Sequence, residues 1–180
     1  MEEGYIEESV RTRLILTGIT ELEEHGITDF SLRRAALAAQ VSCAAPYRHF
    51  KDKDEYIREI ISYVNSKWEL LSREIERIYG DNPPRLAVEI CMASMRFRLA
   101  NKNFSTVFTL AARNEEGSSV DSSVRNAIAR YSEYRSLTIE DALMKEYTAL
   151  ALVSGTVIMS VDGKMDVLSL ARKKLELEFS

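Results

Sequence analysis

The longest unbroken helical pattern in this chain runs from Lys53 to Tyr79 and constrains the fold more than any other feature. Neither glycine nor proline interrupts it, and its apolar residues recur at helical spacing: Tyr56, Ile57, Ile60, Ile61, Val64, Trp68, Leu71, Ile75 and Ile78. At a rise of about 1.5 Å per residue, the helix is about 40 Å long, which is long enough to belong to two structural units. Gly80 ends the pattern, and the Asp-Asn-Pro-Pro sequence at 81–84 is the clearest linker in the chain.

The same periodicity recurs through most of the sequence and predicts an all-α protein. Three prolines and seven glycines are too few for a turn-rich β fold, and an apolar fraction of 46% suffices for a hydrophobic core. The further helices are expected over residues 7–24, 32–39, 43–49, 85–100, 104–112, 120–134, 138–161 and 165–179. With no strand pattern and no repeat, we expect about nine helices in all.

Capping residues mark several of the expected helix ends. Gly26 suits the left-handed position that ends the first helix, and Ser31 and Ser42 suit the N-caps of the next two. Thr138 is expected to cap the helix that follows it, with Asp141 in the capping-box position.

The charge of the chain is unevenly distributed. A formal net charge of −4 argues mildly against nucleic-acid binding. Between Ser31 and Lys53, however, five basic residues and one acidic residue give +4. A local basic face of this kind can bind phosphates while the remaining surface is acidic.

The residue types needed for catalysis or metal binding are sparse. Cys43 and Cys91 lie far apart, and no Cys/His spacing typical of a metal site occurs, so no metal and no disulfide framework are expected. The two histidines, His25 and His49, and the absence of a Gly-rich phosphate loop argue against an enzyme. No cofactor is expected.

The sequence also bears on location. Residues 1–8 are acidic with no apolar run behind them, which argues against a signal peptide. The apolar stretch from Tyr147 to Val161 is too short for a membrane span. We therefore expect a cytoplasmic protein with no membrane partner.

Two of the short helices form a helix-turn-helix pattern. Leu32, Ala36, Val41 and Phe50 can hold the pair together, and small alanines allow close approach. The second helix is then free to present a set of side chains to a DNA major groove: Cys43, Ala44, Ala45, Tyr47, Arg48 and His49.

The segment FSLRRAALAAQVSCAAPYRHFKDKDEY resembles the DNA-binding segment of the tetracycline-repressor (TetR) family of transcriptional regulators. The matching features are the Ser-Leu-Arg opening at 31–33, the Val-Ser turn at 41–42, the Tyr-Arg-His-Phe sequence at 47–50 and Lys53 at the start of the long helix. With the first helix, the match covers roughly residues 7–60. The family pattern implies a helix-turn-helix domain over 1–52 and a helical ligand-binding and dimerisation domain over 53–180.

The chain departs from the family pattern at three positions. Gln40 replaces the usual turn glycine, and a left-handed non-glycine residue there costs on the order of 1 kcal/mol. Ala35 replaces a larger aliphatic residue, and Pro46 is expected at about the fourth residue of the recognition helix.

The resemblance implies which residues contact DNA: Ser31, Arg33, Ser42, Cys43, Ala44, Ala45, Tyr47, Arg48, His49 and Lys53. Lys53 is expected to bind phosphate at a helix N-terminus, and Arg48 to bind a guanine or a phosphate or else to face solvent. Tyr47 and His49 are expected to contact phosphate, with packing of their rings against the first helix as the alternative. Arg34 flanks the same face.

The C-terminal part contains candidates for a cavity that binds a small-molecule effector: Trp68, Met92, Met95, Phe97, Phe104, Phe108, Tyr131, Tyr134, Met144 and Tyr147. Ordinary helical core is the alternative for each of these residues. Arg96, Arg98 and Arg113 are near this set and can meet an anionic ligand or face solvent.

The last two helices carry the expectation of a homodimer through a four-helix bundle. Its candidate residues are Leu143, Leu150, Ala151, Ser154, Gly155, Leu168, Ala171, Leu175 and Phe179. The function implied is a ligand-responsive repressor that binds a palindromic operator as a homodimer. The alternative is a helical interaction protein of the same fold that has lost DNA binding.

Overall fold

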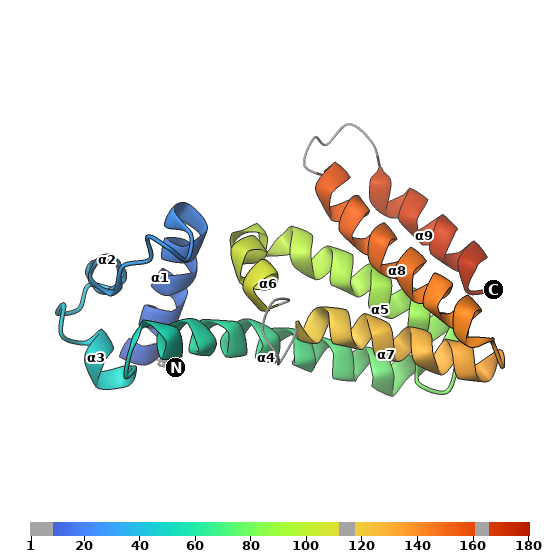
Figure 1. Ribbon diagram of the computed structural model, residues 1–180, viewed down its shortest axis with the longest axis horizontal. Coiled ribbons are helices and arrows are strands. Elements are labelled where there is room, and N and C mark those ends of the chain that lie inside the picture. The colour runs from blue at the N-terminus through green and yellow to red at the C-terminus, as the bar shows by residue number, and fades with distance from the viewer. Residues whose placement is uncertain (1–8, 112–117, 161–165) are drawn as a thin grey trace, which may run out of the picture. The chain divides into compact units, whose positions relative to one another are not determined.

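The computed structural model describes residues 9–111, 118–160 and 166–180 (Figure 1). Every regular element within those ranges is helical, comprising nine α-helices and one short 3-10 helix, which confirms the expected all-α class. The chain forms two compact units. Unit 1 comprises residues 1–64 and 103–111, and unit 2 comprises residues 65–102 and 112–180. The units therefore divide inside the long helix rather than at residue 52, and unit 1 includes a segment from the later part of the chain.

Unit 1 contains α1 (Val10–His25), α2 (Leu32–Ala38), α3 (Pro46–His49), the first half of α4 (Lys53–Tyr79) and α6 (Ser105–Ala111). Its core centres on three aromatic rings. Phe50 stacks on Tyr56 with ring centroids 4.2 Å apart, and Phe30 meets Tyr56 edge-on at 5.4 Å. All three are buried, as expected for Phe50, so the segment after α3 is fastened to α4 by ring packing.

Gly18 allows α1 and α4 to pack closely. A Cβ atom added at this position would lie 2.7 Å from Ile60 Cδ1 and 3.0 Å from the Tyr56 hydroxyl oxygen. The same hydroxyl donates a hydrogen bond to the backbone carbonyl of Leu14. A side chain at position 18 would therefore force the buried side chain of Ile60 to shift, so glycine suits the place where the two helices cross.

Helix α6 is attached to α1 through its N-terminus. The Glu23 carboxylate accepts hydrogen bonds from the Ser105 hydroxyl at 2.7 Å and from the Thr106 backbone N–H at 3.1 Å. A carboxylate is favoured there because the first N–H groups of a helix have no partner within the helix. The short 3-10 helix η1 (Lys102–Phe104) leads into α6.

Unit 2 contains the second half of α4, α5 (Pro83–Ala100), α7 (Ser119–Tyr134), α8 (Ile139–Met159) and α9 (Val167–Glu178). Its core includes Leu86, Ala87, Val88, Ile90, Cys91, Met92, Met95, Val124, Ala127, Ile128, Tyr131, Ala149, Val153, Ala171, Leu175 and Phe179. Two sets of ion pairs reinforce the packing of α9. Glu89 of α5 accepts from Arg172, and Lys145 of α8 donates to Glu178 at 2.8 Å.

Several expected helix ends are confirmed and others are corrected. Ser31 and Thr138 cap α2 and α8 through their hydroxyl groups, and Gly26 ends α1 with a φ of 70°. Asn82 caps α5, so the two prolines expected in the linker form the first turn of that helix, where a missing N–H is tolerated. The expected boundaries at residues 7, 112, 161 and 165, and Arg113, lie outside the described residues.

Candidate nucleic-acid interface and effector groove

The turn between α2 and α3 is a Schellman motif with glutamine in the left-handed position. Gln40 has a φ of 56°, its N–H donates to Leu37 O at 3.0 Å, and the Val41 N–H donates to Ala36 O at 3.0 Å. The residue that departs from the family pattern therefore adopts the conformation for which glycine is preferred. The turn forms despite that departure because both hydrogen bonds use backbone atoms.

Helix α3, the expected recognition helix, is shorter than the sequence predicted. The sequence predicted a helix over 43–49 capped by Ser42, whereas α3 has four residues and begins at Pro46, with Ala45 as its N-cap. The first position of a helix favours proline, because the fixed φ of proline suits the helix and proline has no N–H that would be left unpaired there. Pro46 thus starts α3 rather than distorting it. Ser42 contributes its carbonyl, not its hydroxyl, to the preceding turn, where it accepts from the Ala45 N–H at 2.9 Å.

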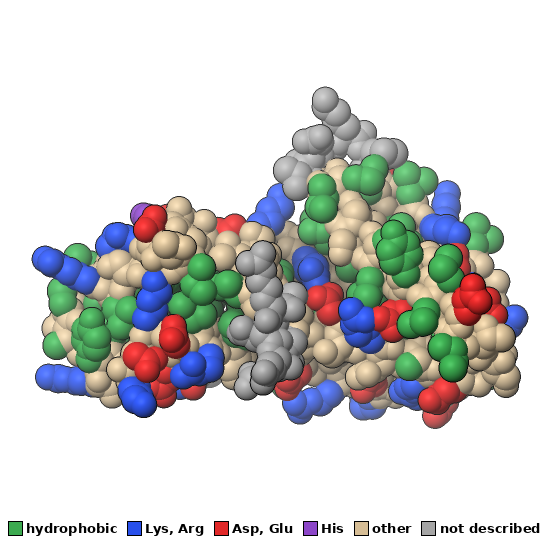
Figure 2. Space-filling view, viewed as in Figure 1, with side chains coloured by type: hydrophobic (Ala, Val, Ile, Leu, Met, Phe, Trp, Pro, Cys, Tyr) green, Lys and Arg blue, Asp and Glu red, His purple; other side chains and the backbone are tan. Residues whose placement is uncertain are grey.

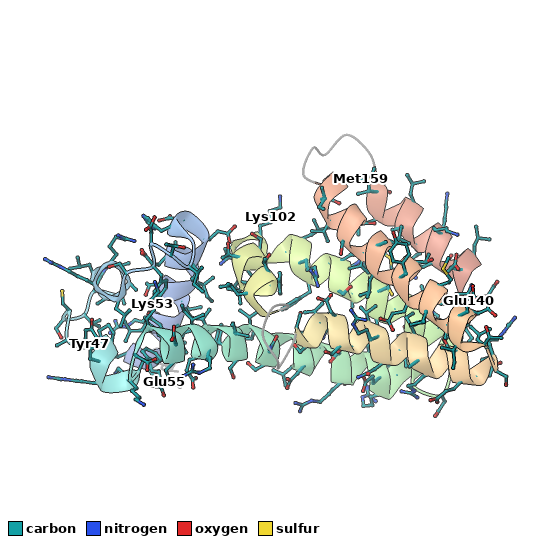
Figure 3. All side chains as sticks on the ribbon, viewed as in Figure 1. Tyr47, Lys53, Glu55, Lys102, Glu140 and Met159 are labelled. Atoms are coloured by element: carbon teal, nitrogen blue, oxygen red, sulfur yellow. The ribbon has the colours of Figure 1, made fainter. Side chains whose placement is uncertain are left out.

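Most of the side chains expected to contact DNA lie on the surface of unit 1. Arg33, Ser42, Cys43, Ala44, Arg48 and His49 are exposed, and Tyr47 is 66% exposed. Figure 3 shows Tyr47 projecting from α3. Ser31 and Lys53 are half-buried, and Ala45 is buried, so its side chain is not presented to a groove.

Lys53 begins α4 with Asp52 before it and Asp54 and Glu55 after it in the sequence. Its ammonium donates to Thr28 O at 3.2 Å and lies 5.9 Å from the centroid of the Phe30 ring. Asp52 Oδ1 caps α4 by accepting from the Glu55 N–H at 2.8 Å. The Asp-x-x-Glu spacing at 52–55 is the sequence signal for such a cap. A phosphate at this helix end would therefore interact with Lys53 but also meet the negative charge of its neighbours.

Arg34 is held by Glu21 of α1. Arg34 Nε donates to Glu21 Oε1 at 2.9 Å, and the Ser31 N–H donates to the same oxygen at 2.9 Å. Burial raises the pKa of the Glu21 carboxyl, but these hydrogen bonds outweigh burial and hold its pKa below the ordinary value. The positive charge of Arg34 is thus compensated within unit 1, and Arg33, Arg48 and Lys51 remain as exposed basic side chains of this segment.

The structure distributes the predicted cavity residues over several places. Trp68, Met92, Met95 and Tyr131 are buried in unit 2, and Trp68 Nε1 donates to the Ser123 hydroxyl at 2.9 Å. Phe104 and Phe108 belong to unit 1, with ring centroids 6.2 Å apart. On the surface of unit 2 lie Tyr134, Met144 and Tyr147. Of the predicted set, Phe97 alone lines the unit 2 groove described next.

A groove of about 430 Å³ lies between α4 and α5 within unit 2. It is lined by Leu71, Ile75, Tyr79, Glu89, Ala93, Arg96, Phe97, Ala100 and Asn101. Its volume falls within the range of about 300–1,000 Å³ typical of small-molecule sites. Of the arginines named as candidates for an anionic ligand, Arg96 lines this groove, whereas Arg98 pairs with Asp121 at 2.6 Å.

Helix α8 presents an apolar face to the surface of unit 2. Figure 2 shows hydrophobic side chains gathered over this helix, and Figure 3 marks its ends with Glu140 and Met159. The strongly exposed members are Ile139, Leu143, Met144, Tyr147, Ile158 and Met159. Of the residues expected in a dimer interface, Leu143, Ala151 and Ser154 are exposed, and Leu150, Gly155 and Leu168 are half-buried. Ala171, Leu175 and Phe179 instead lie in the core of their own unit.

By length and composition alone, α8 is also long and apolar enough to cross a membrane. The helix is longer than the apolar run of 147–161 that the sequence suggested, because it begins at Ile139. Its first turns carry charges that pair within unit 2: Glu146 pairs with Arg125 and Lys145 with Glu178. Its buried residues Ala149 and Val153 belong to the unit 2 core. These contacts favour a helix packed on protein.

The described part of the chain contains two free cysteines and no cluster of metal-binding side chains. Cys43 is exposed and Cys91 is buried, and burial raises the pKa of the Cys91 thiol to about 12. No group of three or more His, Cys, Asp or Glu side chains in those ranges is placed to hold a metal ion.

A helix-turn-helix unit combined with an all-helical second unit defines the fold of TetR-family transcriptional regulators, and the chain has this fold. No family model and no curated protein matches the sequence. Solved structures do match at low identity. The TetR-family regulator PfmR from Thermus thermophilus is 18% identical, with a TM-score of 0.67 over 93% of this chain and 97% of that one.

Two further similar structures contain ligands. The regulator FadR from Bacillus subtilis, in complex with stearoyl-CoA, is 16% identical, with a TM-score of 0.66 over 93% of this chain and 97% of that one. The multidrug binding protein EbrR, in complex with ethidium, is 17% identical, with a TM-score of 0.55 over 96% of this chain and 99% of that one. At such identities the likeness concerns the fold.

Proposed function

We propose that this chain is a cytoplasmic, ligand-responsive transcriptional repressor that binds a palindromic operator as a homodimer and is released by a small-molecule inducer. The observation that carries the proposal is the surface of unit 1. There α2 and α3 expose Arg33, Tyr47 and Arg48 on either side of the turn that joins the two helices. The arginines and Lys53 supply charge for phosphate contacts, and Arg48 can also pair with a guanine.

The homodimer is proposed to form through α8 and α9. The apolar face of α8 includes Leu143 and Tyr147, which are 61% and 71% exposed. A Cβ atom at Gly155 would meet no atom within 4 Å, so a partner helix has room to approach. On α9, the exposed apolar residues Leu170 and Leu177 extend the surface. Exposed apolar area of this kind is typical of an interaction site.

The response to a ligand is proposed to pass through α4. Residues 53–64 of this helix belong to unit 1 and residues 65–79 to unit 2, so one continuous helix is shared. If α4 can adopt two positions and the effector binds unit 2 in only one of them, binding would favour that position. The distance between the two α3 helices of the dimer would then change. The named similar structures with stearoyl-CoA and ethidium support a small-molecule effector in general.

The decisive experiment is selection of bound DNA from a random pool with the full chain. We expect an inverted repeat whose half-sites are about one helical turn of DNA or a multiple apart. Enrichment of single half-sites would contradict the dimeric mode of binding, and no enrichment at low salt would contradict DNA binding itself.

A second candidate is a helical interaction protein of the same fold that does not bind DNA. The observation that favours it is the acidic start of α4, where Asp52 precedes Lys53 and Asp54 and Glu55 follow it. A gel shift with mixed-sequence duplex DNA at low salt separates the two functions. A repressor should bind with an affinity that falls steeply with salt, whereas the interaction protein should not bind.

A further inference from the structure

The outward face of α5 forms one wall of the groove in unit 2. The lining residues Glu89, Ala93, Arg96 and Ala100 recur every three or four positions and so form one stripe along the helix. The buried residues Leu86, Ile90 and Met95 belong to the core and define other faces of α5. The groove is therefore separate from the packed interior in which Met92, Met95 and Tyr131 lie.

The other wall comes from α4 and is apolar. Leu71, Ile75 and Tyr79 lie four residues apart on this helix, and Phe97 of α5 adds a half-buried ring. Leu71 is 39% exposed although it lines a hollow, so apolar surface in the groove is available to a ligand. Burying an aliphatic chain or a ring here would be favourable by the hydrophobic effect.

The charge in the groove is unbalanced. The lining residue Glu89 is already neutralised, because Arg172 donates to both its oxygens at 3.0 Å and Arg85 pairs with it at 2.7 Å. The other charged lining residue is Arg96. Among the described residues, the guanidinium group of Arg96 has neither an ion pair nor a hydrogen-bond partner, although its charge interacts with that of Glu89. Because Arg85 and Arg172 already pair with Glu89, Arg96 leaves the groove with a net positive charge beside apolar surface.

We propose that this groove binds an amphipathic carboxylate, with its apolar body against Leu71, Ile75 and Phe97 and its carboxylate on Arg96. The arginine guanidinium suits a carboxylate because it can donate two parallel hydrogen bonds. A cationic ligand of similar size would be repelled by Arg96, and the acidic lining residue Glu89 is already paired with Arg85 and Arg172. This assignment deepens the proposed function by naming the effector class, and its binding step can be measured without DNA.

The chain has a built-in reporter of the groove. Trp68 is the single tryptophan of the sequence, and its ring lies 5.5 Å from the ring of Phe97. Because Phe97 lines the groove, a ligand that packs on this ring should change the surroundings of Trp68. Intrinsic fluorescence therefore follows occupancy without a label.

The test is a fluorescence titration of the full chain with dodecanoate, dodecanol and dodecyltrimethylammonium, each kept below the concentration at which it forms micelles. We expect dodecanoate to bind more tightly than the alcohol and the alcohol more tightly than the cation. Arg96→Gln should weaken dodecanoate binding about tenfold or more and leave dodecanol binding unchanged, because a charged hydrogen bond is lost. Equal affinity for the anion and the cation, or an Arg96→Gln variant that binds dodecanoate like the wild type, would overturn the assignment.

Two control variants make the result specific. Arg73→Gln removes an exposed arginine from α4 that pairs with Glu69 and does not line the groove, and it should bind all three probes as the wild type does. Ala93→Phe should narrow the groove without adding a second tryptophan, and it should abolish binding of both dodecanoate and dodecanol while helix content is retained. Dodecanoate binding that survives Ala93→Phe in a folded protein would place the ligand elsewhere.

The outcome is independent of the proposed regulation. A chain that binds dodecanoate through Arg96 but selects no DNA would keep this groove assignment and lose the repressor function. A chain that selects an inverted repeat but shows no dodecanoate binding would keep the repressor function and lose the assignment.

Discussion

Glu21 and Arg34 form an ion pair that joins α1 to the start of α2, with Arg34 Nε 2.9 Å from Glu21 Oε1. Glu21 is 6% exposed, whereas the Arg34 side chain is 47% exposed. The same carboxylate also accepts from the Ser31 N–H, so it fixes the N-cap residue of α2. The orientation of the helix-turn-helix therefore depends on a carboxylate of α1, which lies outside the two helices joined by the turn.

The first prediction concerns the pH dependence of this contact. The folded-state pKa of Glu21 is lowered, so its contribution to the free energy of unfolding is fully present above the unfolded pKa of about 4.3. The contribution is lost as the pH falls through the folded pKa. Glu21→Gln should cost about 1–3 kcal/mol at pH 7 and reduce the loss of stability below about pH 4.3. Urea unfolding at pH 7 and pH 3.5 measures both effects.

A surface ion pair provides the control for that measurement. Glu69→Gln removes the partner of Arg73, and both side chains of this pair are well exposed. This variant should change stability by less than about 1 kcal/mol at either pH. A Glu21→Gln variant that is no less stable than Glu69→Gln at pH 7 would contradict the structural role of Glu21.

The second prediction concerns Gln40 in the turn. Because its φ of 56° is unfavourable for a residue with a side chain, Gln40→Gly should raise the free energy of unfolding by about 1 kcal/mol. Ser136, with a φ of 51°, occupies the corresponding position after α7, where the Leu137 N–H donates to Ser132 O at 3.0 Å. Ser136→Gly should therefore stabilise by a similar amount. Denaturant midpoints that fall in both variants would show that these turns are not left-handed.

The third prediction separates two kinds of DNA contact. If Arg48 reads a base, Arg48→Ala should cost about 1–3 kcal/mol of binding free energy and relax the preference at one position of the selected operator. If Lys53 binds phosphate, Lys53→Ala should weaken binding to all sequences and reduce the slope of log K against log salt by about one. Titrations at several salt concentrations, with the selected and a scrambled duplex, measure both. Arg73→Ala on α4 is the matched control and should change neither quantity.

The helical fold could be predicted because its signals are local. The spacing of apolar residues predicted the helices, and the caps at Ser31 and Thr138 follow from side chains that bond to a backbone N–H three residues on. The start of α3 was predicted wrongly because Ser42 and Pro46 both suit a helix start, and the tertiary structure uses Pro46.

Which apolar face meets which neighbour could not be predicted from spacing. Leu175 and Phe179 fit a helical stripe that a partner could cover, yet they pack in the core of unit 2. Met144 and Tyr147 fit a cavity lining equally well, yet they are exposed on α8. Periodicity shows that a face is apolar, but the partner of that face depends on contacts between residues far apart in sequence.

The carboxylate that binds Arg34 shows the same limit for charge. A count over residues 31–53 gives a basic segment, but Glu21 lies outside that window and binds Arg34. The effect of a charge on a distant ligand depends on its nearest partners, which only the folded chain brings together.

The last prediction tests the proposed dimer through α8. A glutamate at an exposed apolar position of an interface would be desolvated without a partner, so Leu143→Glu should shift the protein from dimer to monomer. Leu70→Glu is a matched control, because Leu70 on α4 is 66% exposed and Leu143 is 61% exposed. Sedimentation velocity at micromolar concentration should show monomer for Leu143→Glu and dimer for both the wild type and Leu70→Glu. A wild-type monomer, or a Leu143→Glu variant that remains dimeric while Leu70→Glu dissociates, would exclude α8 as the interface.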